Sequence, residues 1–255
     1  MQFEFYVPSR IIFGEGSLEE LGKRTLPGKK AMLVTSRGGS AKRSGALDKV
    51  LSALKACGEE PAIFNKIGAN PDLDTVNEGA RFARENGCDF IVALGGGSVM
   101  DASKAIALTA PNGENYWDFV AAGTGGGKPV TNKPLPLVAI TTTAGTGSEA
   151  DATAVVTNPA TNEKIGFVHP GMFPALSVVD STLTYGVPSG LTAFQGFDAL
   201  FHATECYVSN KANKMSDMLA LTSMDYASKY LARAVKDGSD KEARDGMSFA
   251  NMLSG

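Results

Sequence analysis

The chain has 255 residues, of which 43% are hydrophobic and 20% charged, a balance typical of an ordinary globular protein with a sizeable core. Its 24 Lys and Arg residues against 27 Asp and Glu residues give a net charge of −3, which excludes a strongly basic surface for nucleic acid or an anionic membrane. Three widely spaced cysteines without a CxxC pair exclude a disulfide framework and a zinc ribbon, and the lack of a signal-like start or a long apolar stretch predicts a cytoplasmic protein.

Short apolar runs and amphipathic segments alternate over the first half of the chain. The runs predict strands buried on both faces, and the segments between them have apolar positions at helical spacing. We expect strands at 31–35, 61–64 and 90–94, and helices at 45–57, 73–86 and 99–110. Repeated strand-helix units of this length predict a parallel sheet with right-handed crossovers.

After residue 116 the pattern changes. We expect strands at 137–140 and 176–179, a hairpin of 152–156 with 164–168, and helices at 191–208, at 214–235 and from about 239. The whole pattern predicts an α/β fold, with an N-terminal parallel-sheet nucleotide-binding domain followed by the first helices of an all-α C-terminal domain. We place the boundary at about residue 185, which gives domains of 1–184 and 185–255.

A glycine-rich cluster from Gly95 to Ser98 lies between a buried strand and a helix, where free backbone amides and the helix dipole bind phosphate. A tight turn is the alternative, but three successive glycines lose backbone entropy that a turn does not require, which favours phosphate binding. Met100 excludes the Rossmann GxGxxG pattern here. A letter match from Gly145 to Ala150 is interpreted as accidental because a β-like segment follows it. The hydroxyl-rich segment 141–148 remains a candidate for hydrogen bonds to a ribose or phosphate.

A second cluster, residues 36–43, directly follows the first strand of the sheet. NAD-selective sites usually carry a carboxylate near such a strand end, and none is present here. The free amides of Gly38 and Gly39, the Ser40 hydroxyl and nearby cations would instead suit a 2′-phosphate. A solvated basic loop is the alternative.

His202 lies four residues after Asp198 on a predicted helix, so the two side chains share a face and can ligate one divalent cation. A surface Asp-His pair is the commoner origin of such spacing and stays open as the alternative. Glu205 and Cys206 follow on the next turn and offer further donor atoms, although Cys206 is more typical of a packed residue. His169, the second of two histidines in the chain, has no partner in the sequence and is assigned no metal role.

Four segments resemble those of the iron-containing, group III alcohol dehydrogenases in order and spacing: NPDLDT (70–75), GGGSVMDASKAIA (95–107), TTTAGTGSEA (141–150) and GFDALFHATECYVS (196–209). GGSAKRSG after the first strand is most similar to the NADPH-dependent butanol dehydrogenase and aldehyde reductase branch. The resemblance implies that cofactor and metal lie in the cleft between the two domains. At the matching positions it implies cofactor-binding roles for Gly38, Gly39, Ser40, Asn70, Gly96, Gly97, Ser98, Asp101, Thr141, Thr142, Thr146 and Lys164, and metal-binding roles for Asp198 and His202.

The reaction implied by the resemblance is hydride transfer between NADP(H) and a small alcohol or aldehyde, with Fe²⁺ or Zn²⁺ polarising the oxygen as a Lewis acid. Either metal suits one carboxylate and imidazoles. The family completes its metal site with two further histidines on later helices, which this sequence does not contain. We therefore expect this chain to bind metal weakly and to have little or no activity. We also expect uncovered apolar surface around Met247, Phe249, Met252 and Leu253.

Two other functions stay open. One is a non-catalytic NADP(H)-binding protein, in which the nucleotide domain binds cofactor but no chemistry follows. The other is a polyol dehydrogenase or a dehydroquinate-synthase-like relative, which the TTTAGTGSE motif and the Asp198/His202 spacing disfavour. Residues 3–14 resemble a strand that pairs across a family homodimer, so a homodimer is expected.

Overall fold

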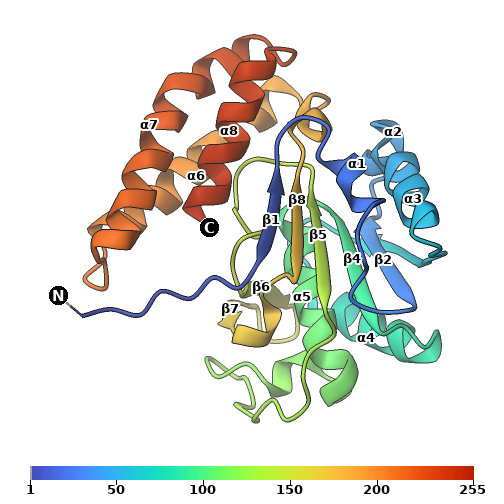
Figure 1. The fold of residues 1–255 in the computed structure, drawn as a ribbon. Coiled ribbons are helices and arrows are strands. Elements are labelled where there is room, and N and C mark those ends of the chain that lie inside the picture. Colours follow the sequence, from blue (N-terminus) through green and yellow to red (C-terminus); the bar gives the residue numbers. More distant parts are fainter. Residues whose placement is uncertain (1) are drawn as a thin grey trace.

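The computed structural model describes residues 2–255 (Figure 1). Six strands form one sheet in the order β1-β8-β5-β4-β2-β3, and every neighbouring pair is parallel. The predicted parallel sheet is therefore confirmed. The strands are β1 (Arg10–Phe13), β2 (Ala31–Ser36), β3 (Ala62–Ile67), β4 (Phe90–Gly95), β5 (Leu137–Thr141) and β8 (Leu176–Val179).

Helices connect these strands, and a separate antiparallel hairpin lies between β5 and β8 in the sequence. The hairpin consists of β6 (Thr153–Asn158) and β7 (Glu163–Val168). The helices are α1 (Leu18–Leu21), α2 (Ser40–Arg43), α3 (Ala46–Ala56), α4 (Leu73–Glu85), α5 (Gly97–Asn112), α6 (Ser189–Val208), α7 (Lys214–Lys236) and α8 (Lys241–Ser254), with single 3-10 turns at Tyr116–Asp118, Pro170–Met172 and Ser181–Thr184.

The sheet is covered on both faces because successive side chains of a strand point to opposite sides. Met32 and Val34 of β2 pack with α4 and α5, whereas Ala31 and Leu33 pack with α1 and α3. This two-sided burial explains why the central strands are continuous apolar runs rather than alternating ones. Helix α5 is itself buried on almost every side, including at Lys104.

The order of the strands creates a crevice above the carboxyl ends of β2 and β4. The chain leaves β2 towards β3 on one side, and it leaves β4 towards β5 on the other. The two connecting helices, α3 and α5, also pack on opposite faces of the sheet. In open α/β sheets, ligands bind at such a topological switch point.

Helices α6, α7 and α8 form a helical lobe beside the ends of β1 and β8 (Figure 1). The lobe packs tightly because small residues meet large ones, as where Gly246 lies against the Tyr230 ring. Ala144, from the loop after β5, belongs to an apolar cluster with Tyr230 and Met247 of the lobe, and so connects the lobe to the sheet. The buried Arg244 guanidinium donates to the Val187 and Gly238 carbonyls and to Thr192 Oγ1, which fixes the segment that enters α6.

Three expectations need correction. The short helices α1 and α2 were not predicted, and α2 occupies part of the segment 36–43, for which a 2′-phosphate site and a solvated basic loop were the two interpretations. Within residues 3–14 only β1 is a strand, and it pairs with β8 of the same chain. The uncovered apolar surface was predicted correctly only in part. Met247 is buried and the Phe249 ring packs between those of Phe13 and Tyr226, whereas Met252 and Leu253 are half-buried and line a largely apolar cavity of about 400 Å³. Further large exposed apolar side chains lie on α6 and α7, at Leu191, Phe194, Phe197, Phe201, Tyr207, Val208, Met218 and Leu221.

The proposed boundary near residue 185 lies between the 3-10 turn Ser181–Thr184 and the start of α6, and it stays a prediction. Within residues 2–255, every helix is too short or too polar to cross a membrane.

Candidate functional site

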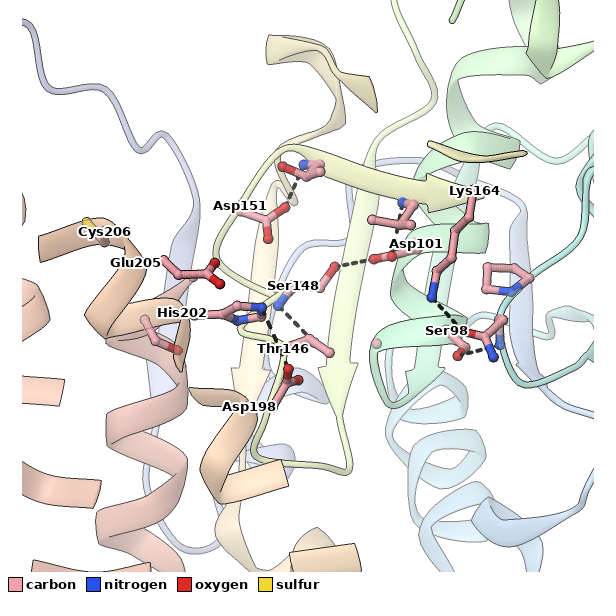
Figure 2. Close-up of a pocket in the computed structure, with 17 residues that line it drawn as sticks. Ser98, Asp101, Thr146, Ser148, Asp151, Lys164, Asp198, His202, Glu205 and Cys206 are labelled. Carbon is pink, nitrogen blue, oxygen red and sulfur yellow. Dashed lines mark hydrogen bonds and ion pairs between the residues drawn. The ribbon is translucent and has the colours of Figure 1, made fainter. Parts of the chain in front are cut away.

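A cleft of about 640 Å³ lies between α6 and the loops at the carboxyl edge of the sheet. Figure 2 shows Asp198, His202, Glu205 and Cys206 of α6 on one side of this cleft, facing residues of the sheet domain across it. The sheet domain contributes six further labelled residues to this cleft: Ser98, Asp101, Thr146, Ser148, Asp151 and Lys164.

A second groove of about 650 Å³ adjoins the first and runs over the switch point of the sheet. The two share Gly97, Ser98, Thr146 and Asp198 in their linings. The groove begins at the loop after β2, crosses the turn after β4 and reaches α6. The combined surface extends from the switch point to the Asp198/His202 pair and could hold an elongated ligand. The volumes of the cleft and the groove both lie in the range found for ligand-binding sites.

The turn from β4 into α5 brings helical amides to the groove. Gly96 caps α5, and its carbonyl accepts from the amides of Val99 and Met100. Gly97 and Ser98 belong to the first turn, where N–H groups have no intrahelical acceptor, and both residues line the groove. Amides in this position favour a phosphate or other anion.

The structure gives a different reason for the glycines in this turn. A Cβ atom on Gly96 would lie 2.7 Å from Thr143 Cγ2, and one on Gly97 would lie 2.5 Å from Thr146 Cγ2. Packing against the threonine loop therefore already requires glycine at these two positions, so the glycines by themselves do not favour phosphate binding. Support for phosphate binding comes from the position of the turn and its free amides.

The loop after β2 forms the far end of the groove. Ser36, Arg37, Gly38 and Ser40 line it, but Gly39 does not. The Gly39 amide donates to the Ser36 carbonyl at 3.3 Å, which corrects the expectation that this amide is free.

Hydroxyl and guanidinium groups, and no carboxylate, lie at or beside this end of the described groove. The Arg43 guanidinium donates to the Gly38 carbonyl at 2.5 Å, and the Ser36 and Ser40 hydroxyls lie 3.2 Å apart. The Arg37 guanidinium packs over Gly68, where an added Cβ would approach it to 3.3 Å. Asp198, at the opposite end of the groove, supplies the one carboxylate in the described lining.

Asn70, Ser98 and Lys164 come together although they are far apart in the sequence. The Lys164 ammonium donates to Asn70 Oδ1 at 2.8 Å, and the Asn70 amide donates to Ser98 Oγ at 3.2 Å. Asn70 adopts a left-handed backbone conformation with φ of 53°. The contacts place the β7 side chain beside the start of α5, so these three predicted residues share one wall of the cleft.

Asp101 lies deeper in the cleft, at the centre of a buried polar network. Its Oδ1 accepts from Ser148 Oγ at 2.7 Å and its Oδ2 from the Val155 amide at 3.0 Å. Burial raises the pKa of Asp101, while the Ser148 hydrogen bond and the charge of Lys104 oppose that rise. Sequence reasoning missed Lys104 and Asp151, and the one available signal was a lysine three residues after Asp101.

The three predicted threonines have different positions. Thr142 and Thr146 line the groove. Thr141 is buried at the end of β5 and donates its hydroxyl to the Thr143 carbonyl at 3.0 Å, so it supports the loop without lining either cavity. As the sequence suggested, no helix follows Gly145 to Ala150 in the structure, so the GxGxxG letter match there has no Rossmann context.

Helix α8 of the helical lobe is hydrogen-bonded to the loop that follows β5. The Gly147 amide donates to Asn251 Oδ1 at 2.7 Å, and Asn251 Nδ2 donates to Glu149 Oε1 at 2.6 Å. Burial raises the pKa of Glu149 from 4.5 to about 7. These residues are about a hundred positions apart in the chain, and no local sequence signal indicates the contact.

Asp198 and His202 provide a candidate pair of metal ligands. Asp198 Oδ1 lies 3.7 Å from His202 Nε2, and both side chains are partly exposed in the cleft. A carboxylate and an imidazole at this separation fit two ligands of one divalent cation. Among residues 2–255, no set of three His, Cys, Asp or Glu side chains is grouped to hold a metal ion. His169 accepts at Nδ1 from the Gly171 amide and so serves as a turn cap.

The chain matches two family models. Residues 8–181 match the one described as "Iron-containing alcohol dehydrogenase", and residues 192–255 match the one described as "Fe-containing alcohol dehydrogenase family, C-terminal".

Known proteins resemble the chain over nearly its whole length. It is 40% identical over 253 residues to choline dehydrogenase of Bacillus subtilis, covering 98% of this chain and 62% of that protein. It is 36% identical over 254 residues to NADH-dependent butanol dehydrogenase B of Clostridium acetobutylicum, covering 99% and 64% respectively. The crystal structure of an archaeal halo-thermophilic alcohol dehydrogenase from a Red Sea brine pool matches with a TM-score of 0.94 at 41% identity, covering 100% of this chain and 65% of that one. The chain thus spans 62 to 65% of the length of these three proteins.

Proposed function

The chain belongs to the iron-containing alcohol dehydrogenase family, and from this premise we propose that it binds NADP(H) and contributes to hydride transfer between that cofactor and a small alcohol or aldehyde. The observation that carries the proposal is the continuous surface from the α5 amides to the Asp198/His202 pair. It combines an anion-binding helix start with a candidate metal pair in one cleft.

Each part of the surface has a role in this proposal. The first-turn amides at Gly97 and Ser98 bind the pyrophosphate, and the hydroxyls of Thr142 and Thr146 offer hydrogen bonds to the cofactor. Lys164, which donates a hydrogen bond to Asn70, would contact a ribose or phosphate of the cofactor. When bound, the cofactor supplies the hydride and Fe²⁺ or Zn²⁺ supplies Lewis-acid polarisation of the substrate oxygen.

The metal part of the proposal concerns Asp198 and His202. Their donor atoms would hold one cation on the α6 side of the cleft. Two protein ligands are fewer than the three of a usual catalytic zinc site, so we expect these two residues alone to bind metal weakly. The choice between Fe²⁺ and Zn²⁺ stays open because both suit a carboxylate with an imidazole.

We propose NADP(H) rather than NAD(H) as the preferred cofactor because no carboxylate lies at the β2 end of the described groove. The Gly38 amide, the Ser40 hydroxyl and the Arg37 guanidinium are compatible with a 2′-phosphate. A butanol dehydrogenase at 36% identity is NADH-dependent, so family membership alone does not decide this preference.

The direct test is titration of the purified chain with NADPH and with NADH, followed by cofactor fluorescence, with and without added Fe²⁺ or Zn²⁺. We expect saturable binding with tighter NADPH than NADH. Absence of binding to both cofactors would contradict the proposal. Oxidation of bound NADPH on addition of a short aldehyde then reports hydride transfer.

The second candidate is NADP(H) binding without chemistry. The observation that favours it is the lack of a third metal-binding side chain grouped with Asp198 and His202 in the described residues. Normal NADPH affinity with no bound metal and no aldehyde-dependent oxidation would support this candidate over the enzyme. The homodimer expected from residues 3–14 stays a prediction.

A further inference from the structure

We propose that Lys104 is a positioning residue of the cofactor site, which fixes Ser148 and Asp101 in the orientation that they present to the cleft. The inference rests on the proposed function, since it takes this cleft to be the place where the cofactor binds. Lys104 does not line the cleft, whereas Ser148 and Asp101 do. It therefore acts through them.

The Lys104 ammonium is fully buried and has all its protons engaged. It donates to Ser148 Oγ at 2.8 Å, to Asp151 Oδ1 at 2.6 Å and to the Thr153 carbonyl at 3.0 Å. An ammonium has three protons and no lone pair, so these three acceptors satisfy it. A buried lysine without such partners would strongly destabilise the fold.

The lysine also determines the direction of the hydrogen bonds around it. Because Lys104 can only donate, Ser148 Oγ must accept from it, and the single Ser148 proton is then directed to Asp101 Oδ1 at 2.7 Å. The other oxygen of Asp101 accepts from the Val155 amide at 3.0 Å. Both carboxylate oxygens are therefore held, and the chain of donors starts at Lys104.

Lys104 also sets the charge balance around Asp101. The groups facing that carboxylate are Lys104 on its own helix, Ser148 and Asp151 on the loop, and Tyr116 on the 3-10 turn. Burial and the Asp151 charge raise the pKa of Asp101, whereas Lys104 lowers it. Without Lys104, Asp101 would take up a proton at higher pH and change from an acceptor into a donor.

The test compares Lys104→Met with the unchanged chain in NADPH and NADH titrations between about pH 6 and 9. Removing a charge-assisted donor from a buried network is expected to weaken cofactor binding about tenfold to a hundredfold at pH 7. The loss should grow as the pH falls, because Asp101 then becomes protonated. A role in stability alone would give a loss that does not depend on pH.

Thr109→Val is the matched control. Thr109 is buried on the same helix, and its hydroxyl donates to the Ala105 carbonyl within that helix. The control should change thermal stability but leave the affinity for cofactor within about twofold, since it does not touch the network.

Ser148→Ala supplies a second, independent comparison. If Lys104 acts through Ser148, the double variant Lys104→Met/Ser148→Ala should lose less affinity than the product of the two single losses. A folded Lys104→Met variant with unchanged affinity, or losses that multiply fully, would overturn the proposal. If Lys104→Met does not fold, unchanged affinity in both Ser148→Ala and Asp151→Asn overturns it, and weakened affinity in both supports it. An unchanged chain that binds neither cofactor would instead overturn the proposed function, and this inference with it.

Discussion

At the scale of single residues, the two ends of the cleft depend on different chemistry. The β2 end lacks a carboxylate within the described groove and offers hydroxyl, amide and guanidinium donors around Ser36. The α6 end brings the Asp198 carboxylate close to the His202 imidazole. A single substitution at the β2 end should therefore alter the preference between NADPH and NADH without changing metal binding. A single substitution at the α6 end should alter metal binding without changing that preference.

Ser36→Asp tests the β2 end. Ser36 is the last residue of β2 and lines the groove, so a carboxylate there would repel a 2′-phosphate and accept from a 2′-hydroxyl. We expect the ratio of NADPH to NADH affinity to fall roughly tenfold or more, measured by fluorescence titration at low salt. Ser52→Asp, an equal charge change on α3 outside the groove, is the control. An unchanged ratio in Ser36→Asp would refute the 2′-phosphate assignment.

His202→Ala tests the α6 end. Loss of the imidazole leaves Asp198 as a single ligand, so binding of added Fe²⁺ or Zn²⁺ should fall to background in an equilibrium metal titration. His169→Ala is the matched control, because this imidazole lies outside the cleft, accepts a hydrogen bond from the Gly171 amide and caps the 3-10 turn Pro170–Met172. Equal metal content in both variants would place the site elsewhere.

At the scale of elements, α5 and the threonine loop form one packed unit. The glycines at the start of α5 allow the loop to lie directly on the first turn of the helix, with Thr143 and Thr146 in the space that Cβ atoms on Gly96 and Gly97 would occupy. On its other side the loop is held by Asn251 of α8. The threonine loop is therefore positioned by contacts on both of its sides.

Gly97→Ala tests this layering. The added Cβ would lie 2.5 Å from Thr146 Cγ2, so the loop must shift. We expect a loss of about 1 to 3 kcal/mol in the free energy of unfolding, together with weaker cofactor binding. Gly190→Ala on α6 is the control, since a Cβ there meets nothing within 4 Å. A Gly97→Ala variant that matches the control in both urea unfolding and titration would contradict the packing account.

At the scale of the whole molecule, the sheet and the helical lobe meet through buried polar contacts beside the cleft. Asn251 bridges Gly147 and Glu149, and Arg244 fixes the segment leading into α6. The lobe also exposes large apolar side chains on α6 and α7, among them Phe194 and Phe201.

Glu149 makes the stability of this junction depend on pH. Its pKa rises from 4.5 to about 7 on burial, so the folded state binds a proton that the unfolded state has released between these values. Stability from this group is fully present below pH 4.5 and is lost as the pH rises through about 7. Glu149→Gln keeps an oxygen acceptor for Asn251 and removes the charge. We expect it to be more stable than the unchanged chain at pH 8, by about 3 kcal/mol in urea unfolding. The difference should vanish near pH 4.5. An equal gain at both pH values would contradict this assignment.

The elements that sequence reasoning identified are those whose signal is local. Strands β2 and β4 are continuous apolar runs, and α6 carries Asp198 and His202 one turn apart, so neighbouring residues alone specify them. The short helices α1 and α2 were missed because four residues are too few for a periodic pattern. Within residues 3–14 the single chain forms only β1, which pairs with β8, and the predicted pairing of this segment across a homodimer stays a prediction.

By itself, the sequence determined the α/β architecture, the glycine turn before α5 and the candidate metal pair, because helix and strand periodicity and one-turn spacing are short-range properties. Only the tertiary structure decided which polar groups meet: Lys104 with Ser148 and Asp151, and Asn251 with Glu149. It also decided why the turn needs glycine, since the threonine loop occupies the space beside it. These contacts join positions more than forty residues apart, and no local pattern encodes which distant side chain will lie across a buried gap.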